Sequence, residues 1–148
     1  MRGSIRQITL ILNQFKMLQS ELENTKMIYD EYNNSHNILK PVDTTREALS
    51  KSYNITSSTE DLAILLIEYK ESIGKLEMQI KAIETALKCL TERERKVVVL
   101  KYIEGMKWSE VSDKLGFSEK WCKEIKKQAY NKLIRVLPVE IYPNIFFE

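Results

Sequence analysis

KWSEVSDKLGFSEKW, residues 107–121, is the stretch that decides the fold of the C-terminal third of this chain. Val111 and Leu115 lie four residues apart and therefore on one face of a helix. Gly116 is suited to end that helix, and Ser118 is a good N-cap for the next one. The stretch therefore predicts two helices joined by a short turn.

The second of these helices is predicted to have one apolar face and, on the opposite side, one basic face. At about 100° per residue, its apolar side chains fall on one stripe, made of Cys122, Ile125, Ala129, Leu133 and Val136. The opposite side gathers Lys120, Lys123, Glu124, Lys127 and Asn131. A short helix, a Gly-containing turn and a second helix of this kind are typical of a helix-turn-helix.

A third helix is predicted just upstream. Thr91-Glu-Arg-Glu94 has the capping-box pattern, so a helix should begin after Leu90, and Gly105 should end it. From Thr91 to Leu137 the chain has 12 basic and 7 acidic residues, although the net charge of the whole protein is only +2. The positive charge is therefore concentrated in this segment, which favours a polyanionic partner.

The segment from Leu90 to Leu137 resembles region 4 of bacterial sigma factors. Four motifs carry the resemblance: LTERER at 90–95, LKYIEG at 100–105, SEVSDKLGFS at 109–118 and AYNKL at 129–133. With its helical N-terminal region, the whole chain looks similar to phage late-gene activators of the RinA and ArpU families. The resemblance implies a double-stranded promoter or operator DNA as partner, and RNA polymerase as a possible second partner.

The resemblance also assigns roles to individual side chains. Five residues at the start of the recognition helix would read bases: Glu119, Lys120, Trp121, Lys123 and Glu124. Lys can donate to guanine, Glu can accept from cytosine, and Trp can contact a thymine methyl group. A second set would meet phosphates, which position the protein without specifying sequence: Arg93, Arg95, Lys107, Ser118, Lys126 and Lys127.

Two residues depart from the sigma pattern: sigma factors are rich in Arg at the positions equivalent to Lys120 through Lys123, whereas here Trp121 interrupts that run and Glu119 adds negative charge. We therefore expect the cognate DNA to differ from an ordinary −35 element. Trp108 and Cys122 are both predicted to lie in the core, and we assign no redox role to Cys122.

Two long helices are predicted upstream, over about residues 5–33 and 59–89, with a polar linker over 34–58. Spacings of four and three alternate along the second helix, which is typical of a coiled coil or helical bundle. The seam residues are Leu62, Leu66, Tyr69, Ile73, Leu76, Ile80, Ile83 and Leu87. One interpretation is an oligomerisation seam that forms a homodimer or higher oligomer. The alternative is a monomeric hairpin in which the seam packs on the first helix.

The predicted fold class is all-α with three parts. Residues 5–89 form a helical hairpin or coiled-coil bundle, residues 90–137 form a three-helix DNA-binding domain similar to sigma region 4, and residues 138–148 form an apolar tail. We expect the tail to fold back onto its own helices, with docking to another protein as the alternative. Residues 1–4 look like an expression-vector leader and are left out of the fold prediction.

Composition argues against several functional classes. No apolar run approaches the ~18 residues of a membrane span, and no signal peptide is visible. Cys89, Cys122 and His36 are far apart in the sequence, so neither a metal site nor a cofactor is predicted, and the cytoplasm of a bacterial host is the expected compartment. The chain has no Gly-rich phosphate loop and no nucleophile–base pair, so we do not predict an enzyme.

The sequence therefore predicts a sequence-specific double-stranded DNA-binding transcriptional regulator, acting as an activator of phage late genes with host RNA polymerase. A stand-alone initiation factor is not expected, because residues 5–90 lack the pattern of a promoter-melting domain. One alternative is a sigma-like adaptor that binds RNA polymerase or another protein without reading DNA. A second is a DNA-packaging protein of the small-terminase kind, although there the DNA-binding unit usually precedes the oligomerisation helices.

Overall fold

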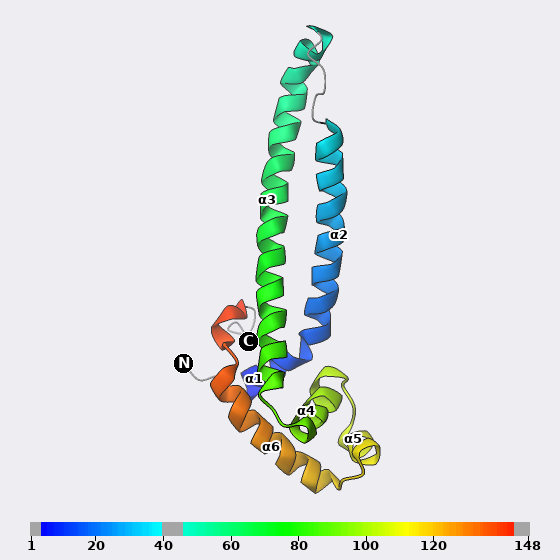
Figure 1. The fold of residues 1–148 in the computed structure, drawn as a ribbon, viewed down its shortest axis with the longest axis vertical. Helices are drawn as coiled ribbons and strands as arrows, with labels where there is room; N and C mark the ends of the chain where they lie inside the picture. Colours follow the sequence, from blue (N-terminus) through cyan, green and yellow to red (C-terminus); the bar gives the residue numbers. More distant parts are fainter. Residues whose placement is uncertain (1–3, 40–45, 144–148) are drawn as a thin grey trace. The chain divides into compact units, whose positions relative to one another are not determined.

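The computed structural model describes residues 4–39 and 46–143, and the side chains of 4–35 and 59–143. The regular structure of this part of the chain is helical, which confirms the predicted all-α class (Figure 1). The elements are α1 (Ile5–Asn13), α2 (Phe15–Leu39), α3 (Arg46–Lys88), α4 (Glu92–Val98), the π-helical turn η1 (Val99–Ile103), α5 (Trp108–Leu115), α6 (Glu119–Val136) and the 3-10 turn η2 (Val139–Ile141).

The chain divides into two compact units. Unit 1 consists of Met1–Gln19 and Met78–Glu148, and unit 2 consists of Ser20–Glu77. The boundary differs from the predicted one, because α1 and the end of α3 belong with the C-terminal helices.

Unit 2 is built from the parts of α2 and α3 that lie side by side (Figure 1). The rings of Tyr32 and Tyr69 stack nearly parallel, with centroids 6.0 Å apart. The ammonium group of Lys26 lies 3.1 Å from the carboxylate of Glu77. The seam of α3 is partly covered here: Leu66 and Leu76 are buried, whereas Leu62, Tyr69 and Ile73 are half-buried.

The rest of the seam lies in unit 1, where Ile80, Ile83 and Leu87 are buried. Ile83 is completely inaccessible to solvent. Packing within one chain therefore accounts for the heptad pattern. Five of the eight seam residues are buried within one chain, and Leu62, Tyr69 and Ile73 remain half-buried.

The predicted linker over 34–58 is helical wherever the structure describes it. Helix α2 continues to Leu39, and α3 begins at Arg46 instead of near residue 59. The polar residues of 46–58 lower helix propensity only modestly, and the segment contains neither Gly nor Pro. The helix therefore extends through them. Pro41, a residue type that interrupts helices, belongs to 40–45, outside the described residues.

The helix predicted over 5–33 is also divided, because α1 ends before Gln14. The backbone N–H of Gln14 donates to the carbonyl oxygens of Leu10 and Ile11, each at 3.2 Å. The interruption separates α1 from α2, and the apolar side of α1 is buried in unit 1. Ile8 and Ile11 are fully buried there. Burial of these side chains stabilises α1 as a short helix separate from α2.

Ser4, left out of the fold prediction, takes part in the fold. Its hydroxyl accepts the backbone N–H of Gln7 at 3.2 Å, and its own N–H donates to the Gln7 side chain at 2.9 Å. This capping box satisfies donors at the start of α1 that would otherwise be unpaired.

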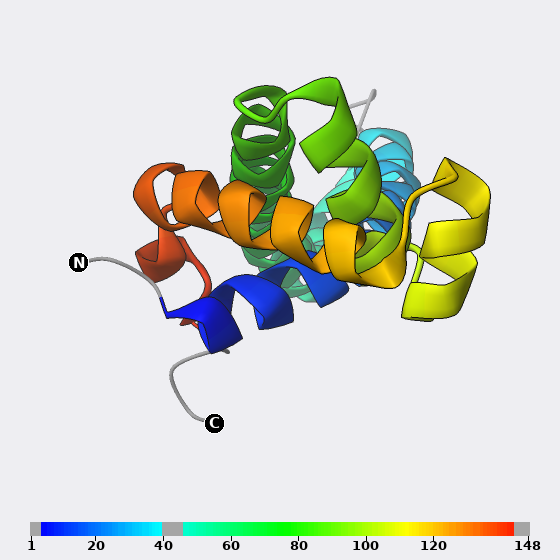
Figure 2. The same ribbon diagram turned by 90° about the horizontal axis from the view of Figure 1, so that it is seen from below.

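Helix α6 is central to unit 1 and lies between α4 and α1 (Figure 2). It contacts α4, in which Val97 and Val98 are fully buried. On the α1 side, the hydroxyl groups of Thr9 and Tyr130 lie 2.7 Å apart. The two sides together fix the rotation of α6 about its axis.

The described part of the C-terminal tail folds back onto α3, as expected. Val139 and Tyr142 are buried. The Tyr142 hydroxyl donates to the Gln79 carbonyl at 2.6 Å, and the Gln79 amide donates to the Ile141 carbonyl at 2.7 Å. Burial raises the pKa of Tyr142 above its ordinary value. Residues 144–148 lie outside the described residues.

We predict that Ile8→Ala lowers the free energy of unfolding by about 2–5 kcal/mol, because it leaves a cavity in the core of unit 1. Ile5→Ala is the matched control in the same helix, since Ile5 is 58% exposed and Ile8 is fully buried. The control should change stability by less than about 0.5 kcal/mol. Urea denaturation followed by circular dichroism measures both, and equal effects would contradict the assignment of α1 to this core.

Candidate nucleic-acid interface

The turn before α6 sets where that helix begins. Gly116 has a φ of +73°, a conformation that favours glycine. The hydroxyl of Ser112 donates to the carbonyl of Phe117 across the turn. Ser118 then caps α6, with its hydroxyl accepting the Trp121 backbone N–H at 3.1 Å. The predicted turn and cap are both confirmed.

The front of α6 is open to solvent within unit 1. Glu119, Lys120, Lys123, Glu124 and Lys127 are all exposed. Four members of the predicted apolar stripe are buried on the opposite side: Cys122, Ile125, Ala129 and Leu133, each at most 1% exposed. Val136, the fifth predicted member, is 42% exposed because it lies at the end of the helix, so the stripe stops at Leu133. The structure therefore brings four of the five predicted base-reading residues onto the exposed side, together with one predicted phosphate-binding residue.

The electrostatic character of this front face is weakly positive. It combines three Lys with two Glu, and the Lys127 ammonium lies 3.5 Å from the Glu124 carboxylate. An exposed ion pair of this kind contributes only about 0–1 kcal/mol, so a phosphate can replace the carboxylate. The positive end of the α6 dipole adds to the attraction for an anion near the first turn.

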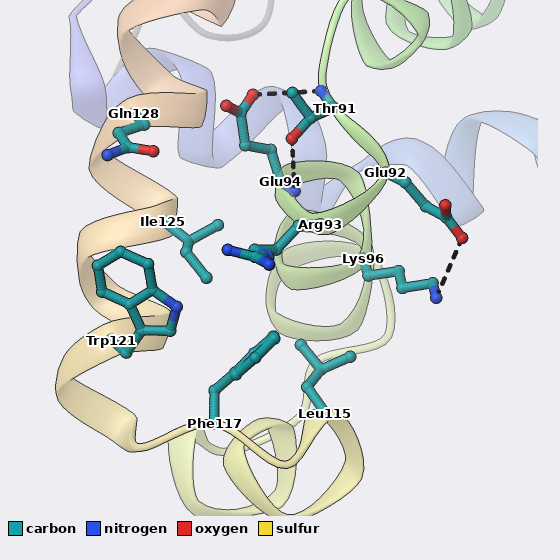
Figure 3. A pocket seen from close by; sticks show the side chains of 10 residues that line it. All are labelled: Thr91, Glu92, Arg93, Glu94, Lys96, Leu115, Phe117, Trp121, Ile125 and Gln128. Carbon is teal, nitrogen blue, oxygen red and sulfur yellow. Dashed lines mark hydrogen bonds and ion pairs between the residues drawn. The ribbon is translucent and has the colours of Figure 1, made fainter.

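Trp121 departs from the predicted base-reading set. Its side chain is 41% exposed and lines a pocket of about 660 Å³ together with Phe117 and Ile125 (Figure 3). Trp121 lies four residues before Ile125, so it falls beside the buried stripe and away from the centre of the basic front. The structure therefore separates it from Lys120 and Lys123.

The pocket beside Trp121 is enclosed by α4, the α5–α6 turn and α6. Its apolar lining includes Leu115 and Phe117, and the guanidinium of Arg93 lies 5.1 Å from the centre of the Phe117 ring. Figure 3 shows Arg93 pointing between Ile125 and Phe117. Arg93 is exposed and charged, but its position is set by this cation–π contact.

Arg95, predicted to meet phosphates, has a structural role instead. Its Nε donates to the Leu87 carbonyl at 3.1 Å and a terminal nitrogen donates to the Leu90 carbonyl at 3.3 Å. The Leu87 carbonyl lies in the last turn of α3 and also accepts the Leu90 backbone N–H at 3.2 Å, and the Leu90 carbonyl lies just after the helix. Arg95 therefore caps α3, which the sequence spacing alone could not indicate.

The other predicted phosphate residues are scattered. The Lys126 ammonium is half-buried and lies 5.4 Å from the centre of the Tyr130 ring. Lys107 is exposed just before α5, and its backbone N–H donates to Glu110 at 2.9 Å. Ser118 is the α6 cap described above. The structure does not gather these residues into one patch with Lys127.

Sequence reasoning missed an ion pair between α6 and α4, in which Glu94 is buried and the Lys132 side chain is 44% exposed. The Glu94 side chain is 7% exposed, and the Lys132 ammonium lies 3.0 Å from both of its carboxylate oxygens. Glu94 was recognised only as part of the capping box, which it does form with Thr91. No sequence pattern predicts an ion pair between two residues that lie 38 positions apart.

The π-helical turn η1 was also not predicted. The Glu104 N–H donates to the Val99 carbonyl at 2.8 Å, one residue further back than in an α-helix. The turn directs Tyr102 toward Trp108 and Tyr130, with ring centroids 6.5 and 5.4 Å away. Trp108, predicted to lie in the core, is half-buried in this aromatic cluster.

A search of the described side chains for three or more His, Cys, Asp or Glu residues placed to hold a metal ion finds none. In the same part of the chain, no helix has the length and apolar character needed to cross a membrane.

Comparison with known proteins identifies the family. Residues 7–135 match a family described as "Protein of unknown function (DUF722)". The chain belongs to this family. The match begins in α1 and ends in α6, so it includes both units.

One curated protein shares part of the sequence. The chain is 36% identical over 70 residues to "Bacteriocin UviA" from Clostridium perfringens. The similarity covers 46% of this chain and 37% of the length of that protein. No solved structure matches the chain.

The capping role of Arg95 predicts a stability effect. Arg95→Ala should lower the free energy of unfolding by about 1–3 kcal/mol, because two carbonyl groups at the end of α3 lose a charged donor. Lys96→Ala is the control on the same helix, since Lys96 only forms an exposed pair with Glu92 at 3.2 Å. Chemical denaturation followed by circular dichroism should find the control within about 0.5 kcal/mol of wild type.

The burial of α6 also predicts unequal thiol reactivity. Cys122 is fully buried, and burial together with the nearby Glu119 carboxylate raises the pKa of its thiol, whereas Cys89 is exposed. A thiol reagent should therefore modify Cys89 quickly and Cys122 only after denaturation. Cys89→Ser should remove the fast phase. Rapid reaction of both thiols in the native protein would show that α6 is not packed as described.

Proposed function

We propose that this protein is a sequence-specific double-stranded DNA-binding transcriptional regulator that inserts α6 into the major groove. One observation carries the proposal: Lys120, Lys123 and Lys127 are exposed on one side of a helix whose other side is buried. A helix that is packed against the protein on one side and presents hydrogen-bond donors on the other has the geometry needed for binding in the major groove.

The exposed residues suit two kinds of contact. Lys120 and Lys123 donate to guanine, and Glu119 and Glu124 accept from cytosine. Lys127 approaches the phosphate backbone after leaving Glu124. Trp121 is not part of this base-reading set, because its side chain lines the neighbouring pocket.

The biological setting is proposed from the resemblance to sigma region 4 and to phage activators of the RinA and ArpU families. In that setting the protein activates phage late genes together with host RNA polymerase. The DUF722 description assigns no function. The relative named as a bacteriocin shares only part of its length with this chain, so we do not transfer that role.

A second candidate function is that of an adaptor that binds another protein without reading DNA. The pocket beside Trp121 favours it, because a partly exposed Trp, a Phe and a Leu together offer an apolar surface. In this alternative the lysines of α6 are not required for partner binding.

The DNA-binding proposal is tested by selecting bound sequences from a pool of random duplexes and measuring affinity by fluorescence anisotropy. Lys120→Glu/Lys123→Glu should weaken binding to the selected duplex by at least about 100-fold, since two donors become acceptors facing bases. Lys81→Glu/Lys88→Glu makes the same charge change at exposed positions of α3 and is the matched control. We expect the control to remain within about tenfold of wild type.

The salt dependence separates specific binding from general attraction. About four to eight phosphate contacts in the complex should give a log–log slope near −4 to −7 for the wild type. Equal affinity for selected and random duplexes would contradict sequence-specific reading. Equal losses in the α6 and α3 variants would show that net charge, and not the front of α6, controls binding.

A further inference from the structure

Unit 1 has a second groove, on the side of α4 and η1 next to the end of α5. It has a volume of about 470 Å³, and its six lining residues are three basic and three apolar: Arg95, Lys96, Lys114, Val99, Leu100 and Leu115. The three apolar side chains are half-buried, and the three basic residues are exposed. Such a groove suits a helix that presents apolar residues flanked by carboxylates.

The charges around this groove are only partly neutralised within the chain. Arg95 donates to the carbonyl oxygens of Leu87 and Leu90, which hold its guanidinium in place without cancelling its charge. Lys96 pairs with Glu92, but both side chains are more than half exposed, so this pair is weak.

A helix face of the required kind is present in unit 2. On α3, Glu60, Ile64, Ile67 and Glu71 follow spacings of four, three and four, so they lie on one face. Ile64 is 57% exposed and Ile67 is 59% exposed, and both Glu residues are exposed. This face lies opposite the seam, because Leu62, Leu66 and Tyr69 fall on the other side of the helix. It is defined below as the acidic face.

We propose that the acidic face of one copy docks in the basic groove of a second copy. Ile64 and Ile67 pack on Val99, Leu100 and Leu115. Glu60 and Glu71, one turn beyond the isoleucines at either end, meet basic residues at the rim. The contact removes two large apolar side chains from water and places opposite charges together.

The contact joins different surfaces, so it is heterologous. If two copies exchange it reciprocally they close as a dimer, and if they do not they form a longer chain. In either case α6 is not part of the contact. Neighbouring copies could therefore bind DNA side by side, and linked binding of this kind raises affinity without new DNA contacts.

Self-association is tested without DNA, so its failure leaves the proposed DNA binding untouched. Sedimentation velocity over a micromolar concentration series should give a mass that rises above the 17.4 kDa of one chain. Glu60→Lys/Glu71→Lys and Lys96→Glu/Lys114→Glu should each raise the dissociation constant at least about tenfold, because like charges then face each other. Arg95 is left unchanged because it caps α3.

The decisive experiment mixes the Glu60→Lys/Glu71→Lys variant with the Lys96→Glu/Lys114→Glu variant. The reversed face of the first variant is complementary to the reversed groove of the second, so the mixture should associate again with nearly wild-type affinity. Glu23→Lys/Glu31→Lys reverses two exposed carboxylates on α2 and should associate like wild type. Ile64→Asn/Ile67→Asn should weaken association without changing charge. Circular dichroism of each variant checks that the helices are retained.

Three results would overturn the proposal. The first is a wild-type protein that stays monomeric through the concentration series. The second is association that the face and groove variants leave unchanged. The third is a mixture of the two variants that fails to associate although each is folded.

Discussion

Burial of one side of α6 is the constraint on which the rest of unit 1 depends. Cys122, Ile125, Ala129 and Leu133 are almost inaccessible, and α4 and α1 cover them from two directions. A helix packed on both flanks cannot rotate without exposing this stripe to water. The rotation of α6 is therefore fixed, and with it the direction of Lys120 and Lys123.

Polar contacts specify the positions of the covering helices. Glu94 of α4 holds Lys132 of α6, and Thr9 of α1 meets Tyr130 of α6. Glu94 and Tyr130 are buried, so losing their partners would weaken the hydrogen bonding of a desolvated oxygen in each case. Burial of Tyr130 also raises its pKa, so the phenol stays protonated and can keep its hydrogen bond with Thr9.

The surface of unit 1 carries three features that a partner molecule could contact. The front of α6 carries the lysines, the pocket beside Trp121 carries exposed aromatic surface, and the groove beside Leu100 carries basic residues over an apolar floor. The pocket and the groove share Lys96 and Leu115, so a protein partner and a second copy would compete at that edge, whereas neither site includes Lys120, Lys123 or Lys127. This arrangement is compatible with a regulator that binds more than one molecule at a time.

Local sequence determined much of this protein. The capping box at Thr91, the glycine turn at Gly116, the Ser118 cap and the stripe of α6 all depend on residues within about one or two helical turns. The structure confirms the first three and the stripe as far as Leu133, whereas Val136 is exposed. The all-α class followed from the same patterns. The exposed side of α6 could be predicted as well, because helical periodicity alone assigns opposite faces to Lys120 and Ile125.

Only the tertiary structure decided how these pieces are used. Thr9 and Tyr130 lie 121 positions apart, and nothing local indicates that α1 ends at Gln14 to join the C-terminal helices. The same holds for Arg95, which was predicted to contact a phosphate because of its charge and which donates to a carbonyl at the end of α3. It also holds for Trp121, whose side chain lines a pocket that α4 helps to form. The heptad pattern of α3 predicted that one face of the helix is buried, but not which elements pack against it. Apolar spacing indicates which side chains are covered and contains no information about the residues that cover them.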